Sequence, residues 1–445
     1  MQKLTQILIF LLAAVVFQFG TGCADTLAAE IPTSWTAQQA VTFAIANNPD
    51  STIARNTIEE AQAAANMTRA TDYPLVNVGA EYGQTNNPMY SFGNILNQGA
   101  FDDTIDFNDP GRTDNLQLKA EASYRIYNGG RDRAEQEAAE AGIGLTRTDL
   151  VAVHRQLGFE VVKNFQAILQ AEEMVMVREE ELAAIGAALD VGLARYEAGD
   201  LLRQDLLNLE LQHSRASEHL IQSKHTLELT RRSFLNLLGL REGQVTINPQ
   251  QSSDQEIPEK IDYRNRHELQ RIAALEQIAV AELQKAEGGK LPTVDGFAGY
   301  QVDNGWVENE TGDSWMAGVR MNYTLFDGNR TTASISGARL KLRKIEGLRI
   351  KTELALNLEV QQALLDYEQA KERLSVTGKM VGVAEEVARL SRARFKEGVI
   401  LASDLIDFEM RLTDARARQL AAKAGYKVAI ANLRRATGLD QFAGN

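Results

Sequence analysis

Two long stretches without proline constrain the fold of this chain more than any other feature of its sequence. Residues 111–248 and 293–445 contain no proline, and all eight prolines lie outside them. Proline in a helix interior costs about 3 kcal/mol. Both stretches are also rich in Ala, Leu, Glu, Gln and Arg, which favour helices. We therefore expect very long helices, and one over residues 131–195 would measure about 97 Å at ~1.5 Å per residue.

A heptad pattern runs through the C-terminal part of each proline-free stretch. Apolar and small residues recur at alternating steps of three and four from Leu206 to Leu237 and from Leu405 to Ala436. This spacing is typical of helices that pack along a coiled-coil seam. The two rows are offset by 199 residues at every position, which indicates an internal duplication.

Turn segments repeat with the same offset. Two of them return 199 residues later, Tyr127–Arg131 as Phe326–Arg330 and Tyr196–Gly199 as Phe395–Gly398. Upstream, Pro74 and Pro292 are 218 residues apart, so the first copy carries an insertion of 19 residues, which we place in the polar stretch Asn86–Asp114. The order of landmarks predicts two structural repeats, residues 34–240 and 267–440, joined by an equatorial linker at 241–266.

Four segments near the starts of the predicted long helices alternate apolar and polar residues, at 76–82, 116–126, 294–302 and 315–325. Each has about the length of a strand that crosses an outer membrane with one face to lipid and one to water. A soluble antiparallel sheet alternates in the same way, but the export signal described next favours the membrane. Four strands cannot close a barrel, and lipid tolerates no open sheet edge. We therefore expect an oligomer, in which three chains would supply twelve strands.

The N-terminus has the features of an export signal. A basic residue precedes the apolar run Ile7–Phe19, and small residues follow, so we interpret residues 1–22 as a signal peptide. No later stretch approaches about 18 uninterrupted apolar residues, and we expect no transmembrane helix in the mature chain. The cleavage region also resembles a lipoprotein site at which Cys23 would be acylated. The alternative is ordinary cleavage after Ala24 or Ala29.

Composition argues against several other classes of protein. The chain has 47 basic and 60 acidic residues, a net charge of −13, and lacks the excess of Lys and Arg that nucleic-acid binding needs. One cysteine excludes a disulfide framework and a cysteine-based zinc site. His213, His219 and His225 are six residues apart, which scatters them around a helix rather than onto one metal-binding face. Phosphate loops, nucleophile elbows and zinc-protease motifs are missing, so we expect no enzyme, cofactor or metal.

The order of these features resembles the TolC family of outer-membrane efflux channels. The resemblance covers about residues 34–440 and is carried by Asn48-Pro49, by Tyr73-Pro74 and Leu291-Pro292 before the strands, by 127–130 and 326–328 after them, and by the two Gly…Asp-Leu turns. It implies a mainly α fold with β, in which long coiled-coil hairpins form a periplasmic tunnel. The four strands per chain would contribute to a trimeric twelve-stranded transmembrane barrel in outer-membrane lipid.

The resemblance also implies a function and partners. The homotrimer would export substrates from the periplasm or an inner-membrane pump to the exterior, as part of a tripartite system with a periplasmic adaptor (membrane fusion) protein. Two alternatives stay open at this point. One is a type I protein secretion conduit of the same fold, and the other is a periplasmic coiled-coil structural or adaptor protein.

In the family the helix-breaking turns form the periplasmic tip, where the tunnel narrows and the adaptor binds. Here these turns correspond to Gly199 and Gly398, since glycine ends helices, and the aromatic residues before them are Tyr196 and Phe395. The resemblance therefore assigns these four residues to adaptor contact.

The gate is expected just beyond the turns, at Asp205, Asp404 and Asp407. Three copies of Asp404 and Asp407 would make stacked acidic rings, which attract cations. Solvated or helix-capping aspartates are the alternative. The family often locks its closed gate with an arginine two residues after the second glycine. That position is Ile400 here, which leaves Arg203 and Arg394 as the nearby substitutes.

Overall fold

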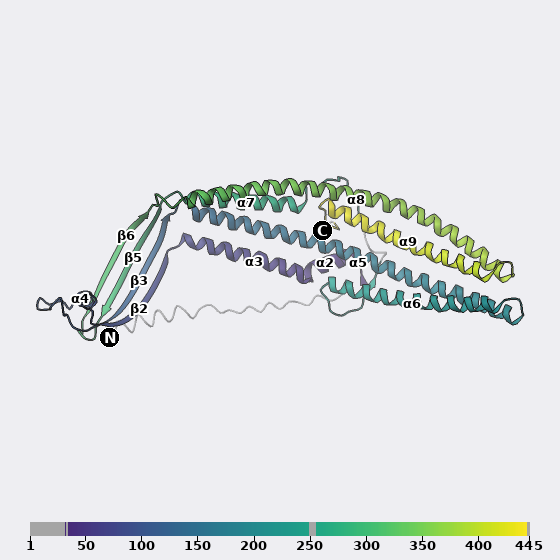
Figure 1. Ribbon diagram of the computed structural model, residues 1–445, viewed down its shortest axis with the longest axis horizontal. Coiled ribbons are helices and arrows are strands. Elements are labelled where there is room, and N and C mark those ends of the chain that lie inside the picture. Colours follow the sequence, from purple (N-terminus) through teal and green to yellow (C-terminus); the bar gives the residue numbers. More distant parts are fainter. Residues whose placement is uncertain (1–31, 33, 249–254, 443–445) are drawn as a thin grey trace.

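The chain is an elongated rod with a β-sheet at one end and two helical hairpin tips at the other (Figure 1). A computed structural model describes residues 32, 34–248 and 255–442. The predicted signal segment and Cys23 lie outside the described residues. Within the described ranges, every helix is too short or too polar to cross a membrane.

The sheet consists of the four predicted strands in the antiparallel order β2-β3-β5-β6. Their bounds are Leu75–Thr85, Thr113–Tyr127, Thr293–Asn304 and Thr311–Asn322. The fourth strand is shorter at its end than the alternation predicted, because Tyr323 and Leu325 lie beyond it. Its last residue pairs with Thr293, and Pro292 before Thr293 has no N–H with which to extend the ladder.

The pairing register places apolar residues from all four strands on one face of the sheet. Val78, Ala120, Tyr300 and Trp315 are successive partners across the sheet, and Val76, Ala122, Ala298 and Ala317 form a second such row. A polar row, Gly79, Lys119, Gln301 and Ser314, is adjacent in sequence to the first row and therefore lies on the opposite face. Strands β2 and β6 form the two edges of the sheet.

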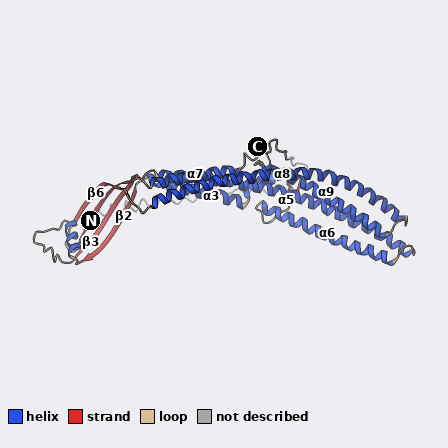
Figure 2. Cartoon of the chain, turned by 45° about the horizontal axis from the view of Figure 1, so that its top comes forward, coloured by secondary structure: helices blue, strands red, loops and turns tan. Residues whose placement is uncertain are grey.

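The two repeats have helices of equal length. Helices α5 (Arg131–Glu197) and α8 (Arg330–Lys396) each have 67 residues, and α6 (Arg203–Leu237) and α9 (Ala402–Ala436) each have 35. Each long helix forms a hairpin with the helix after it, and the hairpins lie side by side (Figures 1 and 2). The predicted seams are buried in part, with Leu405, Leu412, Ala415, Ala422 and Leu433 among the buried residues of α9.

Shorter helices complete each repeat on the half of the rod nearer the sheet. Helix α3 (Pro49–Arg69) packs on α5, and α7 (His267–Gly288) packs on α8 and α5. Helix α2 (Ala37–Asn47) starts at a capping box formed by Thr36 and Gln39. Strand β1 (Ser34–Trp35) pairs in parallel with β4 (Thr246–Ile247) over two residues. Both strands contribute side chains to the hydrophobic core that α2 also joins.

The insertion in the first repeat is not only a polar loop, as its composition predicted. It contains helix α4 (Pro88–Asn97), which is capped by Asn87 and packs against β3 and β6. The face toward the sheet is made by Ser91, Ile95 and Gln98, spaced as one helix face requires. Two of these three residues are polar, whereas the apolar Met89 and Tyr90 are exposed, so the apolar residues of the helix do not mark the face that it buries.

In each repeat a short helix begins beside the end of a long one, α3 beside α6 and α7 beside α9, and we call this place the joint. The two joints have the same backbone geometry but different side-chain hydrogen bonds. Gly239 and Gly438 both adopt positive φ, and a Cβ on either would lie within 3 Å of a backbone oxygen. In the first repeat the Asn48 amide donates to the carbonyl of Leu237 at 2.9 Å. In the second, the buried Arg266 guanidinium donates to the carbonyl of Ala436 at 3.1 Å. The backbone is therefore duplicated more faithfully than the side chains.

Candidate functional site

The two hairpin tips are closed by turns of one type. At the first tip, Gly199 has φ +86°, its N–H donates to Tyr196, and the next N–H, of Asp200, donates to Arg195 at 2.8 Å. At the second, Gly398 has φ +74° and the equivalent bonds run to Phe395 and Arg394. These bonds define the Schellman motif, whose left-handed residue favours glycine. The predicted positions of both helix breaks are thus correct.

A small apolar cluster packs the first tip against the second. Ala188 and Leu209 from the first hairpin meet Phe395, Leu405 and Ile406 from the second, together with Ala402. Ile400, the position at which the family often has arginine, is half-buried against this cluster. An isoleucine here contributes packing rather than an ion pair.

Arg195 crosses from the first tip to the second. Its Nη1 donates to the carbonyl oxygen of Phe395 at 3.2 Å, and its Nη2 donates to the carbonyl oxygen of Asp200 at 3.2 Å. The guanidinium also lies 5.4 Å from the centre of the Phe395 ring. A cation at the C-terminal end of a helix is favoured by the helix dipole, and one over an aromatic face adds a cation–π interaction. Arg195 thus ties the first turn to the Phe395 carbonyl at the end of α8.

Sequence reasoning missed Arg195. The predicted substitutes, Arg203 and Arg394, are exposed and make no ion pair among the described residues. Arg195 is the counterpart of Arg394 at the 199-residue offset, so the duplication contained a signal for it. The sequence did not reveal which of the two equivalent arginines would face the other hairpin.

A bidentate ion pair joins the two helices of the second hairpin just behind its tip. Arg392 donates to both carboxylate oxygens of Glu409, at 2.5 and 2.7 Å. The Glu409 side chain is only 5% exposed. Hydrogen bonding to that carboxylate raises the pKa of Arg392 above its ordinary value. At the equivalent positions the first hairpin has Leu193 and Glu210, so it lacks this pair.

The predicted acidic residues lie in different environments. Asp404 is in the first turn of α9 and exposed, and it makes no ion pair among the described residues. Asp407, one turn later and also exposed, pairs with Arg411 at 2.8 Å. Asp205, in the first turn of α6, is half-buried. Asp404 and Asp205 both stabilise helix N-termini through the helix dipole, and Asp404 alone adds an uncompensated exposed charge.

The two aromatic residues of the tips differ as well. Phe395 is buried beneath Arg195, whereas Tyr196 is 39% exposed. Large apolar side chains project from the turns themselves, since Leu202, Val399 and Leu401 are each more than half exposed. The described ranges contain no group of three or more His, Cys, Asp or Glu placed to hold a metal ion. The turns of both tips therefore present large apolar side chains to the outside.

Comparison with known proteins identifies this arrangement. Residues 41–240 and 263–439 match the family model described as outer membrane efflux protein. The outer membrane protein TolC of Vibrio cholerae serotype O1 is 23% identical over 333 residues, which span 69% of this chain and 72% of that protein.

Solved structures share the fold. The outer membrane protein VceC of Vibrio cholerae superposes with a TM-score of 0.75 at 14% identity, covering 91% of this chain and 97% of that one. The outer membrane channel CmeC of Campylobacter jejuni superposes with a TM-score of 0.77 at 14% identity, covering 92% and 87%.

Proposed function

This chain belongs to the outer membrane efflux protein family, and from that premise we propose that three copies assemble into one channel that spans the outer membrane and extends into the periplasm. The observation that carries this proposal is the four-stranded sheet with one apolar face and two edges. In lipid each edge needs a partner. Strands β2 and β6 run in opposite directions, so β6 of one copy can pair antiparallel with β2 of the next. Three sheets then close a barrel of twelve strands.

The test of assembly is the mass of the detergent-purified protein. Light scattering should give the mass of three chains. A stable monomer would contradict the composite barrel, because an isolated four-stranded sheet leaves its edges unpaired in a detergent micelle.

The transport role follows from the family. An efflux channel of the outer membrane provides the last section of an export route, and the helices of this chain would form its periplasmic tunnel. We place the contact with a periplasmic adaptor, and through it an inner-membrane pump, at the hairpin tips. The exposed apolar side chains of Leu202, Val399 and Leu401, together with Tyr196, support this placement, since exposed apolar patches mark sites of protein association.

Adaptor binding can be tested by a charge placed in the patch. Leu202→Asp with Val399→Asp should abolish co-purification with the adaptor while the trimer persists. The matched control is Met89→Asp, because Met89 is equally accessible but lies at the opposite end of the rod. If the wild type, the Leu202→Asp/Val399→Asp variant and the Met89→Asp variant bind the adaptor equally, the tips are not the docking site.

We assign the selectivity of the entrance to Asp404, with a smaller contribution from Asp407. Three copies of an exposed, unpaired carboxylate would form an acidic ring, whereas Arg411 offsets the charge of Asp407. Asp404→Asn should lower cation selectivity in planar-bilayer recordings, and adding Asp407→Asn should lower it slightly further. The difference should shrink at 1 M salt, where screening limits charge interactions to about 3 Å.

The matched control for the acidic ring is Asp414→Asn. Asp414 is an exposed aspartate on the same helix, farther from the tip, and it pairs with Arg418 at 2.7 Å. Its replacement should leave selectivity unchanged. If the Asp404 variant matches the wild type while trimers remain intact, Asp404 is a solvated residue and the ring should be abandoned.

A further inference from the structure

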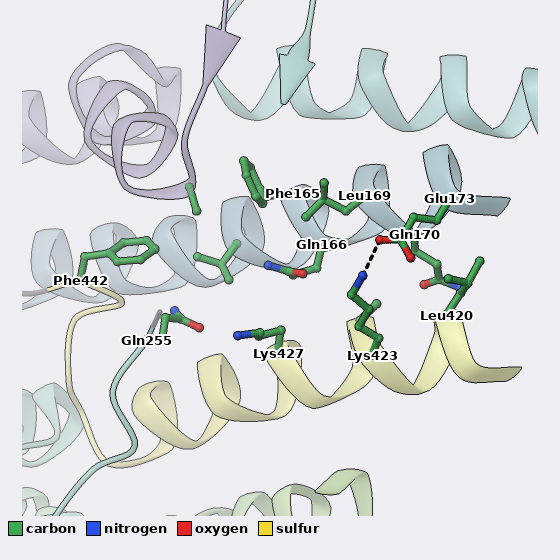
Figure 3. A pocket seen from close by; sticks show the side chains of 13 residues that line it. Phe165, Gln166, Leu169, Gln170, Glu173, Gln255, Leu420, Lys423, Lys427 and Phe442 are labelled. Carbon is green, nitrogen blue, oxygen red and sulfur yellow. Dashed lines mark hydrogen bonds and ion pairs between the residues drawn. The ribbon is translucent and has the colours of Figure 1, made fainter. Parts of the chain in front are cut away.

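A cavity lies between α5 and α9, beside the start of α2 (Figure 3). Its volume is about 320 Å³, at the low end of the range for small-molecule sites, which is about 300–1,000 Å³. The two helices form its long walls, and one end is bounded by Ala37, Gln255 and Phe442. The α5 residues of the lining run from Val162 to Glu173, about 16 Å at ~1.5 Å per residue. The cavity is therefore narrow and elongated along the helices.

One side of the cavity is apolar. Val162 and Phe165 of α5 are buried there and belong to the same hydrophobic core as Trp35. Leu420 of α9 and the ring of Phe442 continue the apolar lining. An elongated apolar surface in a volume this small is suited to one extended alkyl chain, and it is too small for a two-chain lipid.

Polar side chains line the rest of the cavity. Gln166 and Lys427 extend from opposite helices into the space between α5 and α9 (Figure 3). The half-buried side-chain amides of Gln166 and Gln170 have no hydrogen-bond partner among the described residues. Lys423 pairs with Glu173 at 2.6 Å. Since Glu173, Lys423 and Lys427 are the charged residues of the lining, it carries one positive charge in excess.

The internal duplication shows that the coiled-coil pattern does not require these side chains. The residues 199 positions away from Gln166, Lys427 and Phe442 are Leu365, Glu228 and Gly243. Helices α8 and α6 therefore keep the same lengths and heptads without this amide, this cation and the ring that follows α9. The combination of side chains at the cavity is particular to α5 and α9.

We propose that this cavity binds a single-chain amphiphile with an anionic head group. The alkyl chain lies along Phe165 and Leu420, and the head group accepts hydrogen bonds from Lys427 and Gln166. Burial of the chain supplies affinity in proportion to its length, and the ammonium group selects an anionic acceptor. The site is formed by one chain and is remote from the hairpin tips, so it goes beyond the proposed channel and does not depend on it.

Quenching of Trp35 fluorescence measures binding. The chain has three tryptophans, and replacing Trp306 and Trp315 at the sheet end by Phe leaves Trp35 alone. This protein, in phosphatidylcholine nanodiscs, is titrated with 11-bromoundecanoate, whose bromine quenches a nearby indole. We expect saturable quenching, because Trp35 packs in the same core as Val162 and Phe165. Quenching that rises linearly without saturation would overturn the site.

Chain length and head group test the two halves of the site separately. Affinity should rise about fourfold for each methylene added between 8-bromooctanoate and 11-bromoundecanoate. The neutral 11-bromoundecanol should bind about tenfold more weakly than the carboxylate, and the corresponding trimethylammonium probe should not bind. Equal affinity for the three head groups, or no dependence on chain length, would contradict the proposed ligand class.

A charge reversal tests the cation. Lys427→Glu introduces the residue found at the equivalent position of α6, and it should abolish binding of the carboxylate probe and admit the trimethylammonium probe. The matched control is Lys163→Glu, since Lys163 is an exposed lysine of α5 outside the lining. Circular dichroism checks that both variants keep their helix content. Unchanged binding in Lys427→Glu, or an equal loss in Lys163→Glu, would overturn the role of Lys427.

Competition distinguishes two sources of such an amphiphile. Laurate and lauroyl-lysophosphatidylglycerol each have one chain and an anionic head. Displacement of the probe by laurate alone identifies a free fatty acid as the ligand, displacement by the lysophospholipid alone identifies a lipid fragment, and displacement by both confirms the shared chemistry. Displacement by neither overturns the proposal.

The outcomes separate this inference from the proposed function. Saturable, head-group-selective quenching in a protein that light scattering shows to be a monomer would support the cavity and contradict the channel. A trimer without saturable quenching would leave the channel standing and overturn the cavity as a binding site.

Discussion

The first and second repeats of this chain share a backbone but are stabilised by different side-chain chemistry. At the joint between short and long helices, the first repeat uses one amide, Asn48, to cap the end of α6. The second repeat uses the buried Arg266, which bonds two carbonyls at the end of α9 and also pairs with Glu268 and Glu359. Burial opposes the charge of Arg266, but its bonds to these carboxylates raise its pKa above the ordinary value.

The tips repeat this contrast. Behind the second tip, Arg392 and the buried Glu409 clamp α8 to α9, whereas Leu193 stands at the position of Arg392 in the first hairpin. A duplicated backbone therefore tolerates either solution, because glycine turns and helix lengths set the geometry in both. The two repeats differ in how much stability they should lose when one of these side chains is replaced. Removing one member of a buried ion pair leaves an uncompensated charge, which costs more than losing a neutral hydrogen bond.

The largest effect is expected at the second joint. Arg266→Ala should destabilise the protein by about 3 kcal/mol, the low end for breaking a buried pair because its carboxylate partners are partly exposed. Asn48→Ala at the first joint should cost about 1 kcal/mol. Thermal unfolding in detergent measures both. Equal shifts in unfolding temperature would show that the two joints are energetically alike despite their chemistry.

The next effect is expected at the clamp behind the second tip. Arg392→Leu copies the first hairpin into the second and should cost about 2 kcal/mol, since the buried Glu409 loses its partner. Amide hydrogen exchange should rise in residues 396–402. The reciprocal change, Leu193→Arg, places an arginine opposite Glu210 at a half-exposed position and should alter stability by less than about 1 kcal/mol. Unchanged exchange at the second tip in Arg392→Leu would rule out the clamp.

A smaller effect is expected where the tips meet. Arg195→Ala removes two hydrogen bonds to carbonyls and one cation–π contact from a partly buried position, at a cost of about 1 kcal/mol. Because these contacts hold the first turn to the second, the variant should raise the mean conductance in planar bilayers. Arg394→Ala, at the equivalent position, serves as the control and should behave as wild type. The same conductance in both variants would deny Arg195 a bridging role.

The smallest effect is expected from pH. Burial lowers the pKa of His154 near the first joint and of His267 at the second. A histidine with a lowered pKa in the folded state stabilises the fold above its ordinary pKa near 6.5, and this contribution is lost as pH falls through the lowered value. Thermal stability should therefore decrease from pH 7.5 to 5.5. The lowered pKa of Glu268 acts only at more acidic pH, below its ordinary value.

Single variants divide the pH effect between the joints. His154→Gln preserves a polar partner for Ser51, whose hydroxyl lies 2.9 Å from the imidazole Nε2, and should remove part of the pH dependence. His225→Gln replaces an exposed histidine and should remove none of it. A pH dependence that survives replacement of both His154 and His267 would point to other groups.

Local periodicity determined most of the architecture in advance. The proline-free stretches and heptads predicted the long helices and their coiled-coil partners, and the shared offset predicted the internal duplication. Alternation predicted the four strands and their apolar face. Helices and strands follow such patterns because their hydrogen bonds and side-chain directions repeat along the chain. The residues themselves therefore specify the elements and the places where glycine ends them.

Only the tertiary structure decided which of two equivalent residues acts. Arg195 rather than Arg394 bridges the tips because its partner carbonyl, that of Phe395, belongs to the other hairpin, 200 residues away. Helix α4 escaped prediction because its buried face, Ser91, Ile95 and Gln98, is mostly polar and finds its partners on the sheet. Contacts between distant segments depend on which faces of the helices and strands meet in space. The two repeats have the same periodicity, so the sequence pattern does not show which of two equivalent residues faces the other hairpin.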